Sequence, residues 1–185
     1  PPKHLDPAIS YASDESLFLM QVYEPPLGYH FLKRPYELEP LGVDAMPSVT
    51  YLDAGGVPLP AERAGDAAFT RYHLTVRADA RYPAFALTED GAPRYRFDDP
   101  AEGRRYRQIG DFAHTGSRPV RAEDYTYAIK RLADPKAGSP MIGFMGRYIV
   151  GMEALTAELA DVPRDGWLDL RDFHLAGVEV LDERN

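Results

Sequence analysis

The chain has 185 residues, 44% of them hydrophobic and 27% charged, a length and composition that fit one folded domain or two small lobes. Its net charge of −8 argues against nucleic acid or an anionic membrane as a partner, because both select basic surfaces. The absence of cysteine excludes disulfides, thiolate metal sites and cysteine nucleophiles, and no apolar run approaches the roughly 18 residues that span a bilayer.

The first 26 residues predict an extended lead-in followed by a short helix. Ser13 is placed to cap a helix whose first turn is acidic, which suits the positive end of the helix dipole. The pair Pro25-Pro26 ends that helix, because proline cannot continue the backbone hydrogen bonding. One face of the helix carries the apolar side chains Leu17, Met20 and Tyr23.

Residues 27–77 are rich in proline and glycine and predict short strands joined by turns. We expect one strand at residues 48–52, a turn at residues 54–58, and a half-buried strand at residues 69–77, where apolar and polar side chains alternate. Residues 78–119 are ambiguous. Their Arg- and Tyr-containing pieces, around residues 81–82, 94–97 and 104–107, either pair as strands or form an exposed insertion.

The strongest helix prediction covers residues 122–133. Acidic residues occupy its first turn and basic residues its last, and Asp134-Pro135 stops it. Its apolar stripe at helical spacing consists of Tyr125, Ala128, Ile129 and Leu132. A second helix is expected over residues 146–159, with Ile149, Met152 and Leu155 on its inner side and weakened by Gly151. Met141, Phe144, Met145 and Met152 form an adaptable apolar cluster, of which all but Met141 favour ordinary core.

Residues 178–181 predict a strand and residues 182–185 a turn, which leaves a strand edge without a partner. The chain also starts at Pro1 rather than methionine. Both features lead us to expect a processed chain or a fragment of a longer protein.

No residue pattern predicts catalysis, a metal site or a cofactor. Asp98 and Asp99 are adjacent and would point to opposite faces of a strand, so a solvated turn is favoured over acid–base chemistry. Ser117 and Ser139 lack the context of a nucleophile elbow, and no phosphate-binding glycine loop is present. The basic run at residues 104–107 favours a solvated strand edge over an anion site. None of the five histidines forms a ligand pair by spacing: His4, His30, His73, His114 and His174.

Five segments resemble the family 5 extracellular solute-binding proteins, which bind oligopeptides, dipeptides, nickel chelates and related ligands. Residues 5–11 (LDPAISY) resemble the opening "LDPA" of the family, and residues 22–29 (VYEPPLGY) resemble its "VYEPLLGY" stretch. Residues 118–135 (RPVRAEDYTYAIKRLADP) resemble the helical signature of the family, although Arg121 stands where a capping Thr is usual. Ser139-Pro140 and residues 177–183 (GVEVLDE) resemble a later "SP" and a hydrophobic hairpin.

The resemblance implies an α/β fold of mixed helices and strands, of the periplasmic-binding-protein type II. Residues 1–24 would belong to the first lobe, and residues 25–185 would form most of the extra subdomain of that lobe. The second lobe would lie outside this chain. Ligand contacts carry over to two places: the loop Tyr11, Ala12 and Ser13, and Met141, which stands where a Tyr is common. From the residues alone, Tyr11 either stacks on a ligand or packs partly buried against the first helix.

The function implied is therefore the substrate-binding component of an ABC importer. It would capture peptides or peptide-like solutes in the periplasm as a monomer and deliver them to an inner-membrane permease, without catalysis. The alternative is a periplasmic sensor or scaffold with the same binding fold and no transport role. A hydrolase is the third reading, and no pairing of nucleophile and base supports it. A nickel-chelate role is not supported by the histidines.

Overall fold

The computed structural model describes residues 3–82, 119–163 and 168–185, and it shows a mixed α/β architecture with two small sheets and several helices. The predictions at residues 94–99, at 104–107 and at Ser117 lie outside these residues. In chain order the elements are α1 (Ser13–Val22), β1 (Leu27–Tyr29), β2 (Leu38–Pro40), β3 (Ser48–Leu52), β4 (Pro58–Leu59), the 3₁₀ helix η1 (Ala61–Asp66), β5 (Phe69–His73), α4 (Ala122–Leu132), α5 (Ile142–Tyr148), α6 (Met152–Asp161) and the 3₁₀ helix η2 (Leu170–Asp172).

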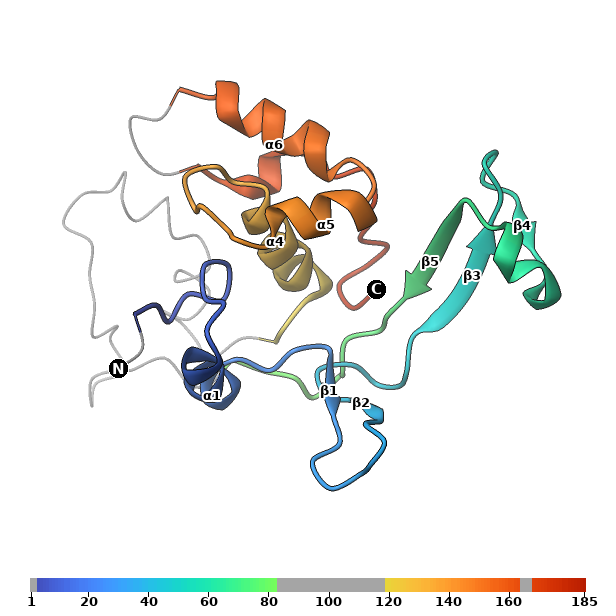
Figure 1. Ribbon diagram of the computed structural model, residues 1–185, viewed down its shortest axis with the longest axis horizontal. Helices are drawn as coiled ribbons and strands as arrows, with labels where there is room; N and C mark the ends of the chain where they lie inside the picture. Colours follow the sequence, from blue (N-terminus) through green and yellow to red (C-terminus); the bar gives the residue numbers. More distant parts are fainter. Residues whose placement is uncertain (1–2, 83–118, 164–167) are drawn as a thin grey trace.

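The helices α4, α5 and α6 gather in one cluster, and β3 and β5 form an arm to one side of it that runs up from the region of β1 and β2 (Figure 1). All strand pairing in the described residues is antiparallel: β1 pairs with β2, and β3 lies between β4 and β5 with Thr50 opposite Arg71. The predicted strand at residues 48–52 and the turn after it are confirmed. Gly56 has φ +79°, and the Asp53 carboxylate accepts from the amides of Gly55 and Val57, so the turn is closed by its own side chain.

The strand predicted at residues 69–77 is shorter than expected and is not half-buried. β5 ends at His73, and all five of its residues are exposed, including Tyr72 at 61%. Alternation of apolar and polar residues predicts a buried face only if another layer covers the sheet. Burial resumes after the strand, at Val76, which bridges to Val43 and is 3% exposed.

The predicted helix at residues 122–133 is confirmed as α4, although Ala128 of its apolar stripe is exposed. The predicted helix at residues 146–159 is wrong as a single element. It is divided between α5 and α6 by a turn at Gly151, whose φ of +82° is the left-handed conformation that glycine adopts without strain. A Cβ at Gly151 would lie 2.9 Å from the Cβ of Ala176, so contact with the C-terminal segment also requires glycine there.

The main core lies between these helices and the segment that follows them, and the inner side predicted for α6 is confirmed. Met152 and Leu155 are 0% and 1% exposed, and Ile149 packs against them. Phe144, expected in the core, is 56% exposed instead. Each fully buried large apolar side chain contributes about 1.5–3 kcal/mol, so this cluster is the main stabilising unit of the described chain. Its buried members are Ala133, Met152, Leu155, Leu159, Leu170 and Leu175.

The cap predicted at Ser13 is wrong. Ser13 is already helical, and the N-cap is Ala12, which has an extended backbone and no side-chain acceptor. The N-terminal segment is held instead by Glu15, which is 3% exposed. Its carboxylate accepts from Ser10 Oγ at 2.7 Å and from the amides of Lys3 and His4, and these hydrogen bonds, that of Ser10 foremost, lower the pKa of Glu15 to about 2.

The strand predicted at residues 178–181 is also wrong, since this segment is extended but belongs to no sheet among the described residues. The turn after it is present: the Asp182 carboxylate accepts from the amides of Arg184 and Asn185. The segment then forms main-chain hydrogen bonds with the start of α4 and with the residues after β5. Glu183 O accepts from Ala122 N at 2.9 Å, and Arg184 O accepts from Val76 N at 2.7 Å. No helix in the described residues is both long and apolar enough to traverse a bilayer.

Candidate functional site

Helix α4 is the point at which distant segments of the chain meet. Near its C-terminal end, Arg131 forms a bidentate ion pair with Asp6, with Nη1–Oδ1 at 2.8 Å and Nη2–Oδ2 at 2.5 Å. The two side chains are 35% and 30% exposed, so solvent screens the pair only in part. The hydrogen bond from Arg131 is the largest cause of the lowered pKa of Asp6, and the same bond raises the pKa of Arg131.

The middle of α4 contacts the segment after α1 through Tyr125. Its hydroxyl lies 3.5 Å from Glu24 O, and partial burial raises the pKa of this phenol. Arg77 holds the same segment from the other side of the chain: its guanidinium bonds the Glu24 carboxylate at 3.2 Å and Leu41 O at 2.9 Å. A Cβ at Gly42 would collide with the Tyr125 hydroxyl, so only glycine permits this close approach.

The N-terminus of α4 is closed without a Thr cap. The side chain of Arg121 has no hydrogen-bond acceptor, so it cannot cap the free amides of the first turn as Thr would. Instead, the Arg121 amide donates to the Asp124 carboxylate at 2.8 Å. The next amide, that of Ala122, is satisfied by Glu183 O. The Nε of Arg121 is buried and has no hydrogen-bond partner in the part of the chain that the structure describes.

The residues predicted to touch a ligand lie on two separate elements. Tyr11, Ala12 and Ser13 are exposed at the start of α1, and Tyr11 is 74% exposed, which rules out partly buried packing of this ring. Met141 is half-buried at the N-cap of α5. No hydrogen bond or ion pair within residues 3–82, 119–163 and 168–185 joins Met141 to this loop. Their role in ligand binding stays a prediction.

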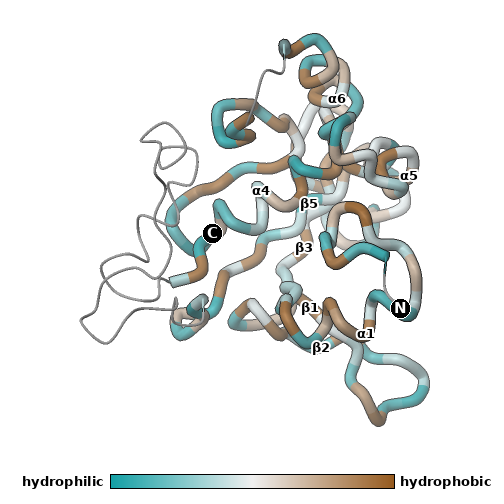
Figure 2. Tube along the Cα trace, turned by 90° about the vertical axis from the view of Figure 1, so that its left-hand side faces the viewer, coloured by the Kyte–Doolittle hydropathy of each residue, from teal (hydrophilic) through white to brown (hydrophobic). Residues whose placement is uncertain are grey.

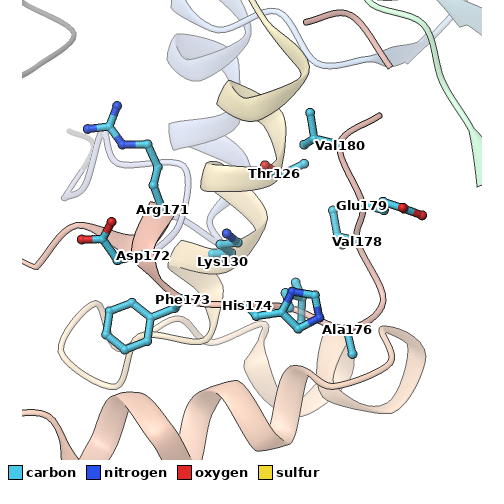
Figure 3. Close-up of a pocket in the computed structure, with 11 residues that line it drawn as sticks. Thr126, Lys130, Arg171, Asp172, Phe173, His174, Ala176, Val178, Glu179 and Val180 are labelled. Carbon is cyan, nitrogen blue, oxygen red and sulfur yellow. The ribbon is translucent and has the colours of Figure 1, made fainter. Parts of the chain in front are cut away.

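The described residues form a groove in a different place, between α4 and the C-terminal segment (Figure 3). Two adjoining cavities of about 460 and 360 Å³ share Thr126, Lys130 and Val180, and we call them together the α4 groove. The first is also lined by Arg171, Asp172, Phe173, His174, Leu175, Ala176, Val178 and Glu179. The second is also lined by Arg121, Glu123, Asp182 and Glu183.

The two walls of the α4 groove differ in character. Val178 and Val180 turn toward α4 and Glu179 turns away, as expected for an extended segment (Figure 3). On the helix, Thr126 and Lys130 are four residues apart and therefore share one face. The Thr126 hydroxyl donates to Glu123 O at 3.0 Å. Arg171 is held by Asp169 through two bonds of 2.9 and 2.8 Å, and these raise the pKa of its guanidinium.

The α4 groove combines charged side chains of both signs, such as Lys130 and Glu123, with the apolar side chains of Val178 and Val180. Among the described residues no group of three or more His, Asp or Glu side chains is placed to hold a metal ion. The groove could not be predicted from the sequence, because its walls are about fifty residues apart along the chain. The available signal was the polar stripe Glu123, Thr126 and Lys130 on α4, whose spacing of three and four residues places them on one face of the helix.

No family model matches this chain, and neither the curated proteins nor the solved structures contain a match to it. The resemblance to solute-binding proteins therefore depends on the sequence segments themselves and on how the fold arranges them.

Proposed function

We propose that this chain is part of the substrate-binding component of an ABC importer and takes part in the non-covalent capture of peptides or peptide-like solutes. The observation that supports this most directly is the ion pair between Asp6 and Arg131. Asp6 belongs to the "LDPA" segment and Arg131 to the helical signature, and the two residues are 125 positions apart. A structural bond between two segments of one resemblance is the arrangement expected if both belong to the same fold.

Two more segments also contact α4. The "VYEPPLGY" segment reaches Tyr125 through Glu24, and the "GVEVLDE" segment reaches the first turn through Glu183. Three segments of the resemblance thus contact the helix formed by a fourth, although they were identified separately in the sequence. Convergence of this kind supports a common origin of the segments and is the basis of the proposal.

In the proposed mechanism, residues 1–24 contribute to one lobe, residues 25–185 form its extra subdomain, and a second lobe closes over the ligand about a hinge. The bidentate pair fixes the chain just before Tyr11, Ala12 and Ser13, so an exposed loop is presented from a rigid anchor. Tyr11 would stack on an extended peptide, and Met141 would form an adaptable apolar wall. Capture would take place in the periplasm, before release to the permease.

The test is titration calorimetry, in which pools of tri- to pentapeptides are added to the whole protein to which this chain belongs. We expect micromolar binding, with every peptide recovered intact by mass spectrometry, because capture is not catalysis. Tyr11→Ala should weaken binding about two- to tenfold, the size of an aromatic contact. The control is Tyr72→Ala, which removes another exposed tyrosine, 61% exposed on β5.

Two results would count against the proposal. Cleavage of the peptides would indicate a hydrolase, and equal effects of Tyr11→Ala and Tyr72→Ala would show that the loop before α1 does not contact the ligand. The 185-residue chain by itself should bind peptide weakly, since the proposed second lobe would be missing. Micromolar binding by this chain alone would contradict that expectation.

A further inference from the structure

The loop between β1 and β2 carries two large apolar side chains at its tip, and no other described element covers them. Phe31 and Leu32 are 86% and 78% exposed, and every residue in the range 31–38 is exposed. The loop projects away from the cluster of α4, α5 and α6 (Figure 1), and Figure 2 shows that its tip is hydrophobic. Adjacent apolar side chains at the end of a projecting loop form a patch of the kind that marks a contact surface.

The β1–β2 loop is ordered by its own polar groups. At its base, the amide of His30 donates to Glu37 O at 2.8 Å. At its tip, Arg34 Nη1 donates to Lys33 O at 2.7 Å and to Phe31 O at 3.2 Å. The exposed side chains are therefore presented by a folded turn, which lowers the entropy lost when they enter a partner.

The charge of Arg34 has no carboxylate partner in the described residues. Its guanidinium bonds main-chain carbonyls and lies over the Tyr36 ring, 4.2 Å from the centroid. Lys33, beside it, forms an ion pair of 2.6 Å with Glu37. Residues 25–36 contain no Asp or Glu, although the whole chain contains 29 of them. The loop is therefore a locally basic surface on an acidic protein.

This combination of side chains fits the interface of a lipid bilayer. There, apolar side chains enter the edge of the hydrocarbon, Lys and Arg keep their charges among the phosphates, and tyrosine rings lie at the level of the headgroups. Tyr29 and Tyr36, on the two limbs of the loop, are in edge-to-face contact with their centroids 5.7 Å apart. A protein partner fits less well, because two side chains on a projecting tip bury well under the area of about 800 Å² per partner of a standard interface.

We propose that the β1–β2 loop docks this protein on a lipid bilayer, with Phe31 and Leu32 inserted below the headgroups and Arg34 at the lipid phosphates. The net charge of −8 opposes long-range attraction to an anionic membrane. Charges are screened beyond about 8 Å at physiological ionic strength, however, so the composition of the tip decides the contact itself. The site does not depend on a transport role.

The test is co-sedimentation of the whole protein to which this chain belongs with vesicles of phosphatidylcholine and phosphatidylglycerol. We expect reversible binding with half-saturation at about 1 mM lipid, weaker than the anchoring by one myristoyl chain. Phe31→Ser and Leu32→Ser should each weaken binding about tenfold, the effect of withdrawing one large apolar side chain. The matched control is Val57→Ser, which removes a 58% exposed side chain from the turn between β3 and β4 and should leave binding unchanged.

Arg34→Gln separates the contribution of the headgroups from that of the hydrocarbon. It should weaken binding about fivefold on vesicles that contain phosphatidylglycerol and leave binding to phosphatidylcholine alone unchanged. Equal losses on the two kinds of vesicle would show that Arg34 only holds the loop and would overturn its place at the phosphates. The control is Arg63→Gln, which removes an exposed arginine on η1 and should have no effect on either kind of vesicle.

The docking proposal is overturned if the vesicles do not retain the protein, or if Phe31→Ser and Val57→Ser bind equally. A dimer that Phe31→Ser dissociates in analytical ultracentrifugation, without lipid, would place a second copy on the tip and would also overturn it. Weaker peptide binding by Phe31→Ser would place the tip in the solute site instead. Peptide capture is measured without lipid, so the docking proposal and the proposed function can fail separately.

Discussion

The ion pair between Asp6 and Arg131 allows a quantitative test of how α4 organises the fold. The perturbation is a double-mutant cycle of Asp6→Asn and Arg131→Gln, which removes each charge singly and then both. Two unit charges about 4 Å apart gain about 4 kcal/mol at an effective dielectric constant of about 20. Exposed pairs retain only about 0.2–1 kcal/mol. This pair is bidentate and about one-third exposed, so we expect a coupling energy of about 1.5 kcal/mol.

The assay is urea unfolding followed by circular dichroism at 222 nm, with the free energy of unfolding extrapolated to water for the four proteins. The control cycle uses Arg63 and Asp66, an ion pair of similar length at 2.9 Å whose side chains are 60% and 61% exposed. Its coupling energy should be below about 0.5 kcal/mol. Equal coupling in the two cycles would refute the inference that Asp6 and Arg131 hold distant segments together.

Three further predictions concern stability, all measured by urea unfolding. Gly151→Ala should destabilise the protein more than Gly56→Ala. Both positions have positive φ, which costs about 1–2 kcal/mol in a non-glycine residue, but only at Gly151 does the new Cβ meet Ala176. Equal losses of stability would contradict this packing. Leu155→Ala, at 1% exposure, should cost about 2–5 kcal/mol and Leu17→Ala, at 69%, less than about 0.5; similar losses would place the core elsewhere. The pKa of Glu15 is about 2 in the folded protein against an ordinary 4.5, so its contribution to the free energy of unfolding is complete above pH 4.5 and is lost as pH falls toward 2. Glu15→Gln should therefore lose less stability than the wild type between pH 6 and pH 3. Parallel curves of stability against pH would show that Glu15 is not the acid-sensitive group.

Features that depend on nearby residues could be predicted from the sequence. α4 was predicted within one residue because its acidic first turn, basic last turn and apolar spacing all act within eleven residues. The turn before β4 was predicted because Asp53 and Gly56 form it with local bonds.

Features that depend on distant partners could not be predicted. The approach of Ala176 to Gly151, at the turn between α5 and α6, depends on the fold, and the exposure of β5 follows from the lack of a covering layer in the described residues. Burial of Glu15 likewise requires Ser10 and two amides to fold back on α1, an arrangement that no helical pattern indicates. The α4 groove belongs to the same class, because Lys130 and Val180 are brought together only by the fold.

The central claim is that this chain takes part in the non-covalent capture of peptides. Titration calorimetry of tri- to pentapeptides with the whole protein to which this chain belongs tests it most directly. The account predicts micromolar binding, recovery of intact peptide, and a loss of affinity in Tyr11→Ala that Tyr72→Ala does not reproduce. Absence of binding to every peptide pool, or release of cleaved peptide, would contradict it.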